Sequence, residues 1–126
     1  MNTLSYDSLT RSLLDAIPEI RDVYQQKAKF SGEEFGPHVV YGDVLTEGLV
    51  LPLLSSSRPN ETLLRKVFKF LECLAGDDNP MIRDVVRVTV LERIGDNPES
   101  LSRAKEYMGA ATRALSNDIE KFWGRL

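Results

Sequence analysis

The sequence contains little of what builds a metal centre or a disulfide framework. Among its 126 residues there is one cysteine, Cys73, and one histidine, His38. A single cysteine excludes an intramolecular disulfide, and one cysteine with one histidine leaves too few soft ligands for a zinc site. We therefore expect no metal and no cofactor, and a fold that depends on packing alone.

Long hydrophobic runs and an N-terminal targeting signal are also lacking. The longest apolar stretch, residues 48–54, is far shorter than the roughly 20 residues that a membrane-spanning helix needs. Residues 1–7 have neither the basic start nor the apolar centre of a signal peptide. The sequence predicts a cytoplasmic protein that has no membrane partner.

An excess of positive charge is absent too. The formal net charge is −3, and 28% of the residues are charged, which is the balance of a soluble globular chain. A basic face that displaces counterions from phosphate is missing from the chain as a whole, so we expect no nucleic-acid partner. A mildly acidic protein suits basic partners better. The length predicts a single domain that covers residues 1–126.

What the sequence does contain is a repeated signal for helix ends. Two segments each contain a glycine, an asparagine and a proline that are typical of helix ends. They are Gly-Asp-Asp-Asn-Pro at 76–80 and Gly-Asp-Asn-Pro at 95–98. The glycine tolerates a left-handed helix end, the asparagine is an N-cap, and the proline suits the first helical position. Between them lies a valine-rich run of about fifteen residues, which is too long for an ordinary strand. We expect this run to be a central helix.

Elsewhere hydrophobic residues recur at three- and four-residue spacing, as in amphipathic helices. The expected helices cover residues 5–17, 18–29, 37–54, 60–75, 79–94, 97–108 and 110–123. Gly42, Gly48 and Pro52 interrupt the third of these, so its last turn is expected to be distorted. Short connections favour antiparallel neighbours. The sequence therefore predicts an all-α protein of about six or seven helices, in antiparallel hairpins stacked as a bundle or a HEAT-like array.

Three carboxylates fall on apolar faces of the expected helices. On a wheel of 100° per residue, Glu92 lies among valines of the central helix, and Asp43 and Glu47 lie one turn apart among apolar residues. All three are predicted to point inward. In one interpretation they line a cleft with His38 and act as general acid and base or hold a divalent ion. In the favoured one they lie at the edge of helix packing, paired with Arg, Tyr or free helix amides.

Other candidates for chemistry are weak. The chain has no Gly-x-Ser-x-Gly elbow, no phosphate-binding glycine loop and neither His-Glu-x-x-His nor Glu-x-x-His. We interpret Cys73 as a buried or half-buried inert thiol and His38 as a locally hydrogen-bonded residue at a helix start. Phe122 and Trp123 are interpreted as packing anchors. We expect that the protein is not an enzyme.

Four segments carry a resemblance to known proteins: Pro-His-Val-Val-Tyr-Gly-Asp-Val-Leu at 37–45, Phe-Lys-Phe-Leu-Glu-Cys-Leu at 68–74, Val-Thr-Val-Leu-Glu-Arg-Ile-Gly-Asp at 88–96 and Tyr-Met-Gly at 107–109. Together they resemble a group of small, all-helical bacterial proteins without assigned chemistry. Within that group, the chain most resembles immunity proteins of polymorphic or contact-dependent toxin systems. The resemblance implies a cytosolic protein that binds one cognate toxin domain, often a nuclease, and blocks it by occlusion. It assigns no site residues.

The sequence leaves three functions open. The favoured one is an immunity protein that neutralises a basic toxin by stoichiometric binding, as a monomer in complex with its partner. The acids Glu33 and Glu34, with Asp43 and Glu47 as members of a cleft, are the predicted binding surface. The alternatives are a small helical enzyme that uses Asp43, Glu47 and Glu92, and a helical adaptor with another partner.

Overall fold

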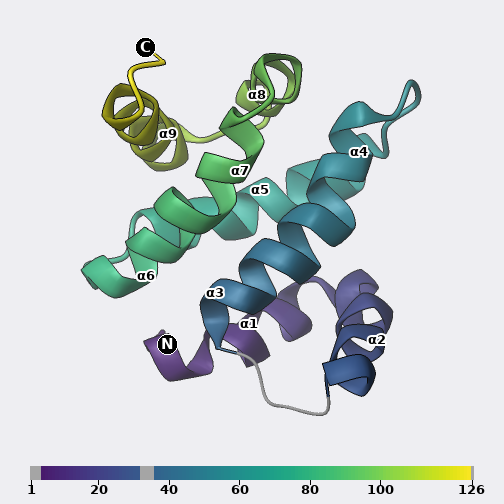
Figure 1. The fold of residues 1–126 in the computed structure, drawn as a ribbon. Helices are drawn as coiled ribbons and strands as arrows, with labels where there is room; N and C mark the ends of the chain where they lie inside the picture. Colours follow the sequence, from purple (N-terminus) through teal and green to yellow (C-terminus); the bar gives the residue numbers. More distant parts are fainter. Residues whose placement is uncertain (1–3, 32–35, 126) are drawn as a thin grey trace.

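Every secondary-structure element in the described part of the chain is helical. The computed structural model describes residues 4–31 and 36–125, which are 81% helical and contain no strand. The segments join into seven helices that form a bundle (Figure 1). Within the described ranges, no helix has the length and apolarity needed to cross a membrane. The expected all-α fold is confirmed.

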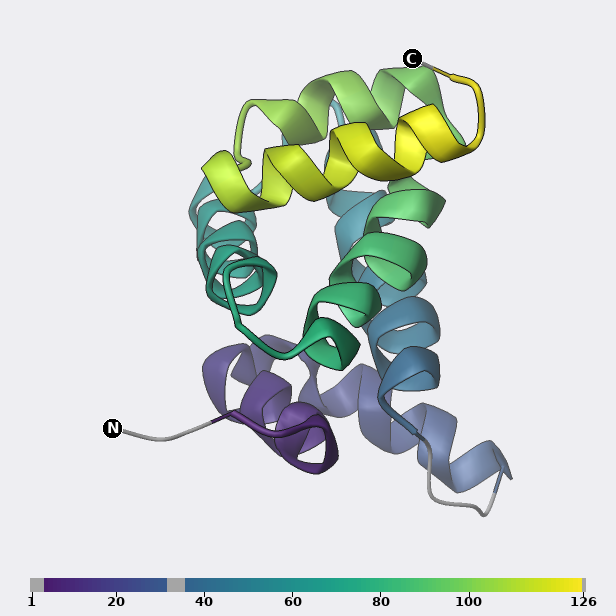
Figure 2. The same ribbon diagram turned by 90° about the vertical axis from the view of Figure 1, so that its left-hand side faces the viewer.

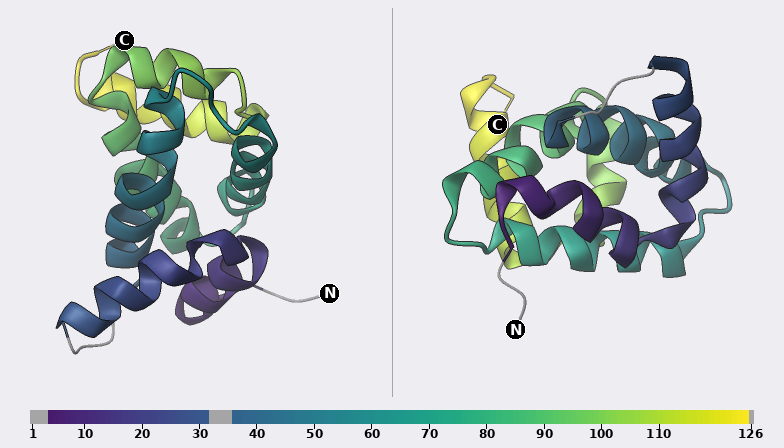
Figure 3. Two further views of the ribbon diagram at one scale, coloured as in Figure 1. Left: turned by 90° about the vertical axis from the view of Figure 1, so that its right-hand side faces the viewer. Right: turned by 90° about the horizontal axis from the view of Figure 1, so that it is seen from below.

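Two helices, each opened by a short 3-10 turn, form the N-terminal end of the bundle. They comprise η1 (Tyr6–Ser8), α1 (Leu9–Ala16), η2 (Pro18–Ile20) and α2 (Arg21–Ser31). Pro18 begins the second helix, where its missing N–H needs no partner. Leu9, Leu13, Ile17 and Ile20 are fully buried. Seen from below, α1 and α2 lie in front of the other helices (Figure 3).

Two long helices occupy the middle of the molecule. The first joins α3 (Pro37–Val39), η3 (Val40–Val50) and α4 (Leu51–Ser55), and the second joins α6 (Pro80–Asp84), η4 (Val85–Leu91) and α7 (Glu92–Gly95). Between them in the sequence, α5 (Glu61–Ala75) runs behind both in Figure 1 and returns the chain to the start of the second. The two long helices therefore run in the same direction, and η3 contacts η4.

The last two helices lie at the end opposite α1 and α2. They are α8 (Pro98–Lys105) and α9 (Ala110–Phe122), drawn in light green and yellow in Figure 2. α9 packs against both η4 and α5. The second long helix is thus in contact with α5, α9 and η3, which agrees with its predicted central position.

Asparagine side chains begin three of the helices. The side chain of Asn60 accepts a hydrogen bond from a backbone N–H of α5, that of Asn79 from one of α6, and that of Asn97 from two of α8. Because these bonds satisfy N–H groups that have no partner within the helix, they fix its first turn. Gly76 and Gly95 end α5 and α7 as predicted, but without a left-handed backbone, since Gly124 alone among the described glycines has a positive φ, of 69°.

Both long helices widen in the middle. η3 and η4 are π-helical, so each N–H bonds to the carbonyl five residues back instead of four. The backbone N–H of Leu51 donates to the Thr46 carbonyl, and the Thr46 hydroxyl donates to the Tyr41 carbonyl at 2.7 Å. Pro52 has no N–H to extend this pattern, and the helix continues as a regular α-helical turn. The expected distortion therefore exists, but ahead of the last turn where it was predicted.

A carboxylate on α5 holds the start of α9. Glu72 accepts hydrogen bonds from the backbone N–H groups of Ala111 at 2.9 Å and Thr112 at 2.8 Å, and from the Thr112 hydroxyl at 2.7 Å. Gly109 makes room for it, because a Cβ at that position would overlap the carboxylate. Burial raises the pKa of Glu72, but the hydrogen bonds outweigh burial and the pKa lies below its ordinary value of 4.5.

Glu72→Gln is expected to lower the free energy of unfolding by about 1 kcal/mol at neutral pH, because a neutral oxygen is a weaker acceptor. A carboxylate whose folded pKa is lowered adds stability above its unfolded pKa, near 4.5, and this stability is lost as the pH falls through the folded pKa. Urea unfolding at a series of pH values should show the two proteins converging in stability at low pH. A difference that stays constant throughout would contradict this role of Glu72.

Candidate functional site

A surface hollow lies between the two long helices and opens to solvent. Its volume is about 360 Å³. It is lined by His38, Val39, Asp43, Val88, Thr89, Glu92, Arg93 and Asp96. We call it the charged hollow. Two of the three predicted inward acids, Asp43 and Glu92, are among its lining residues, and Glu47 is not.

Arg93 is at the centre of the charges around the hollow. Its guanidinium donates a hydrogen bond to the Asp43 carboxylate at 2.9 Å and lies 3.7 Å from the Glu47 carboxylate. Lys27 of α2 approaches the other Asp43 oxygen at 3.4 Å. The hydrogen bond from Arg93 is the main reason why the pKa of Asp43 lies below its ordinary value. Asp43 is therefore ionised at neutral pH.

Gly42 allows this approach of the two helices. A Cβ on Gly42 would come within 2.7 Å of the guanidinium carbon of Arg93, which is closer than real side-chain contacts. The absence of a side chain lets the guanidinium lie directly against the backbone of η3. In this position Arg93 reaches Asp43 and ties η3 to α7.

His38 and Thr89 form a second link between the helices. The Nδ1 atom of His38 and the hydroxyl of Thr89 lie 2.5 Å apart, and the Tyr6 ring is beside the imidazole at a centroid distance of 6.2 Å. The residues are 51 positions apart in the sequence, so the predicted local role of His38 is wrong. Thr89 is buried and His38 is exposed, so the pair lies at the edge of the hollow.

Glu92 differs from the other acids at the site. Its side chain is half-buried and, among the residues that the structure describes, it has no hydrogen-bonding or ion-pair partner. Asp96, at the end of the hollow, pairs with Arg125 at 3.1 Å. Glu92 thus presents a carboxylate without a counter-ion to whatever enters the hollow.

The predicted inward orientation is wrong for Asp43 and Glu47. The Asp43 and Glu47 side chains are 37% and 53% exposed, and both are ion-paired to Arg93. These two acids match the favoured interpretation of paired charges at the edge of helix packing. A π-helical turn holds more residues than an α-helical one, so a wheel of 100° per residue misplaces the faces of both long helices. Glu33 and Glu34 lie outside the described residues.

Three further residues behave differently from the sequence-based interpretation. Cys73 is exposed, and not buried or half-buried as predicted. Phe122 and Trp123 are 70% and 50% exposed, and their rings pack edge to face on each other at 5.1 Å. Phe122 is the last residue of α9 and Trp123 is its C-cap, and neither side chain is buried in the core. They therefore do not anchor α9 to the core. Within the described ranges, no group of three His, Cys, Asp or Glu side chains could hold a metal ion.

These features define a small all-α bundle with a charged hollow between two parallel helices. The family described as "Domain of unknown function (DUF7674)" matches residues 10–124, and the chain belongs to this family. Neither the curated proteins nor the solved structures compared with the chain include a significant match. Membership agrees with the resemblance to small proteins of unassigned chemistry.

Proposed function

We propose that this protein is an immunity protein that binds a cognate bacterial toxin domain and neutralises it by stoichiometric occlusion. The charged hollow is the observation that supports the proposal most strongly. It presents Asp43, Glu92 and Asp96 on one open surface between two helices. Such a surface is complementary to the lysine and arginine side chains of a basic protein, for example a nuclease domain.

The charges of the hollow are only partly neutralised within the chain. Asp43 is paired with both Arg93 and Lys27, Glu47 lies near the same Arg93, and Glu92 has no ion-pair partner in the described ranges. The net charge of −3 adds an attraction at long range that accelerates encounter with a basic partner and weakens as salt is added. We therefore expect rapid, salt-sensitive association.

The alternative of an enzyme that uses the three acids receives less support from the geometry. A general base needs a pKa near the working pH, but the ion pair with Arg93 lowers the pKa of Asp43. Two of the three acids are already occupied by the same arginine. A helical adaptor would use the same surface and differ only in its partner.

Growth of a bacterial host tests the proposal. A toxin domain encoded beside the gene for this protein is produced alone and together with it, and the growth curves are compared. We expect arrest with the toxin alone, recovery on co-production, and a one-to-one complex by light scattering. Toxicity that persists despite complex formation would contradict neutralisation. Recovery at a small molar fraction of this protein would instead indicate turnover and contradict occlusion.

A further inference from the structure

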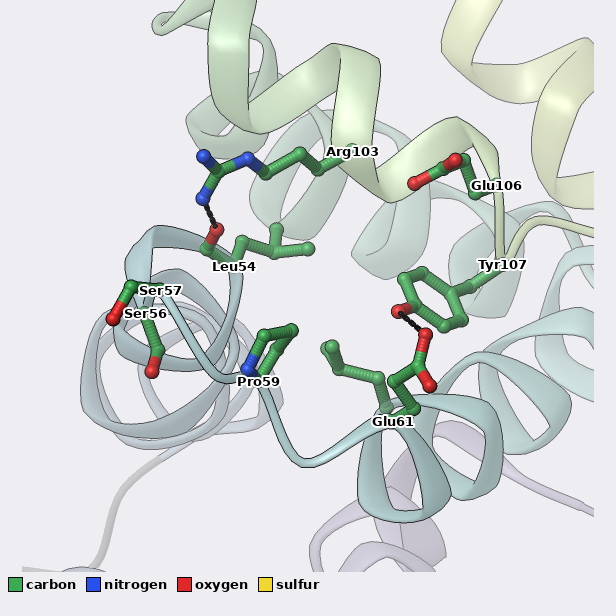
Figure 4. A pocket seen from close by; sticks show the side chains of 9 residues that line it. Leu54, Ser56, Ser57, Pro59, Glu61, Arg103, Glu106 and Tyr107 are labelled. Carbon is green, nitrogen blue, oxygen red and sulfur yellow. Dashed lines mark hydrogen bonds between the residues drawn. The ribbon is translucent and has the colours of Figure 1, made fainter.

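A second hollow lies between the loop at 56–60, the start of α5 and the end of α8 (Figure 4). It is lined by Leu54, Ser56, Ser57, Pro59, Glu61, Leu64, Arg103, Glu106 and Tyr107. We call it the tyrosine hollow. Its volume is about 200 Å³. At roughly 30 Å³ for each water-sized group, it holds about seven of them, which is the size of one arginine side chain.

Tyr107 forms a fixed aromatic wall of this hollow. Its ring stacks on that of Phe68, with centroids 6.1 Å apart and planes inclined by 23°. Its hydroxyl donates a hydrogen bond to the Glu61 carboxylate at 3.4 Å. Because a buried ring and a carboxylate hold Tyr107 from two sides, the wall is formed before any ligand binds.

Two carboxylates border the same ring. Glu61 extends from α5 and Glu106 from the end of α8, so they reach the hollow from different helices (Figure 4). Burial and then the negative charges of Glu61 and Glu106 raise the pKa of Tyr107, while Arg65 opposes them. Both carboxylates are thus close to the aromatic wall. In the part of the chain that the structure describes, the Glu106 carboxylate has no hydrogen bond or ion pair.

The one cation that lines the tyrosine hollow is engaged elsewhere. Arg103 donates from one nitrogen to the Leu54 carbonyl, at 2.5 Å, and from another to the Glu99 carboxylate, at 2.9 Å. These bonds hold its guanidinium at the α4 side of the hollow, away from Tyr107 (Figure 4). Arg103 therefore does not neutralise Glu61 or Glu106.

We propose that the tyrosine hollow binds the side chain of an arginine from a protein partner. A guanidinium is planar, stacks on an aromatic ring and pairs with a carboxylate through two parallel hydrogen bonds. Tyr107, Glu61 and Glu106 supply one ring and two carboxylates for this purpose, and Leu54, Pro59 and Leu64 supply apolar contacts for the methylene groups.

An arginine within a polypeptide suits the site better than the free amino acid. Free arginine carries a charged α-carboxylate and a charged α-ammonium, both of which lose water near the hollow, whereas a peptide-linked arginine has neither. This site does not share a lining residue with the charged hollow, and its ligand does not have to be a toxin. The inference therefore stands or falls separately from the proposed function.

Nuclear magnetic resonance titration of the full chain with N-acetyl-arginine methylamide tests this inference. We expect saturable shifts of the backbone amides of Leu64, Arg103 and Tyr107. The citrulline analogue, which is neutral and nearly the same shape, should bind at least tenfold more weakly, and the lysine analogue and free arginine should also bind more weakly. Equal binding of citrulline or lysine would overturn the guanidinium assignment. Tighter binding of free arginine would contradict the inference that the ligand is an arginine within a polypeptide. Absence of saturable shifts would contradict binding in the tyrosine hollow.

Matched variants locate the interaction. Glu61→Gln with Glu106→Gln is expected to weaken arginine binding at least tenfold, while Asp22→Asn with Asp78→Asn, which removes the same charge at exposed positions outside the hollow, should leave it unchanged. Circular dichroism shows whether each variant is folded. If the first double variant is unfolded, Glu106→Gln alone is used, because the Glu106 side chain makes no hydrogen bond or ion pair with the described residues. Equal losses in both double variants would overturn the site.

Discussion

Alanine in place of Tyr41 is expected to lower the free energy of unfolding by about 4 kcal/mol, as for other large buried rings. Tyr41 is fully buried, and its hydroxyl donates a hydrogen bond to the Leu9 carbonyl at 2.9 Å. The substitution leaves a cavity between η3 and α1 and removes the buried hydrogen bond to the Leu9 carbonyl. Urea unfolding followed by circular dichroism measures the loss.

Tyr41→Phe separates the hydrogen bond from the packing. It keeps the ring but removes the hydroxyl that donates to the Leu9 carbonyl, so we expect a loss of about 1 to 2 kcal/mol. This variant also serves if the alanine variant does not fold. Wild-type stability in the phenylalanine variant would contradict the buried hydrogen bond, and wild-type stability in both would contradict the position of the ring.

Arg125→Met is expected to lower the free energy of unfolding by about 2 to 3 kcal/mol, because it leaves the Glu120 carboxylate buried without a partner. The Glu120 side chain is only 4% exposed, and its carboxylate accepts hydrogen bonds from Arg125, the shortest at 2.6 Å. This is less than the roughly 3 to 5 kcal/mol for fully buried pairs, because Arg125 is itself 30% exposed. Gly95 makes this packing possible, since a Cβ there would overlap Glu120.

A double variant distinguishes an unpaired charge from lost packing. Glu120→Leu combined with Arg125→Met removes both charges, and we expect it to recover much of the stability lost in the single variant. Arg58→Met is the matched control, because Arg58 is exposed and its guanidinium has no ion pair in the described ranges. Equal stabilities of Arg125→Met and Arg58→Met would contradict the buried ion pair.

The parts of the fold that local chemistry determines could be predicted from the sequence. The helix expected at 60–75 is Glu61–Ala75, and the asparagine N-caps at Asn79 and Asn97 begin helices as predicted. An N-cap acts on N–H groups two or three residues away, so the signal and its effect lie in the same short stretch. Periodic apolar residues then indicate the length of each helix.

The width of the long helices could not be predicted in this way. Gly42, Gly48 and Pro52 indicated an irregular helix, but not that eleven residues, Val40–Val50, would be π-helical. In η4, branched valines crowd an ordinary helical turn, which explains their low α-helix propensity but does not specify a wider turn. Because a π-helix has a different period from an α-helix, the inward orientation predicted for Asp43 and Glu47 was wrong.

The partners of the site residues depend on topology. Asp43 meets Arg93, and His38 meets Thr89, only because α5 returns the chain so that two long helices lie side by side in the same direction. Each pair is about fifty residues apart, and no spacing rule connects its members. Opposite charge was the one feature of the sequence that indicated Arg93 as a partner of Asp43. The chain holds 16 lysines and arginines, so charge alone could not identify which of them forms the pair.

The affinity of the purified toxin complex, measured by calorimetry, tests most directly whether the charged hollow is the contact surface. Glu92→Lys reverses a carboxylate that has no partner in the described part of the chain, and Asp78→Lys makes the same change at an exposed position outside the hollow. We predict that Glu92→Lys weakens binding by at least about tenfold, or 1.4 kcal/mol, and that Asp78→Lys changes it by less than about twofold. Equal affinities of the wild type and both variants would contradict the account.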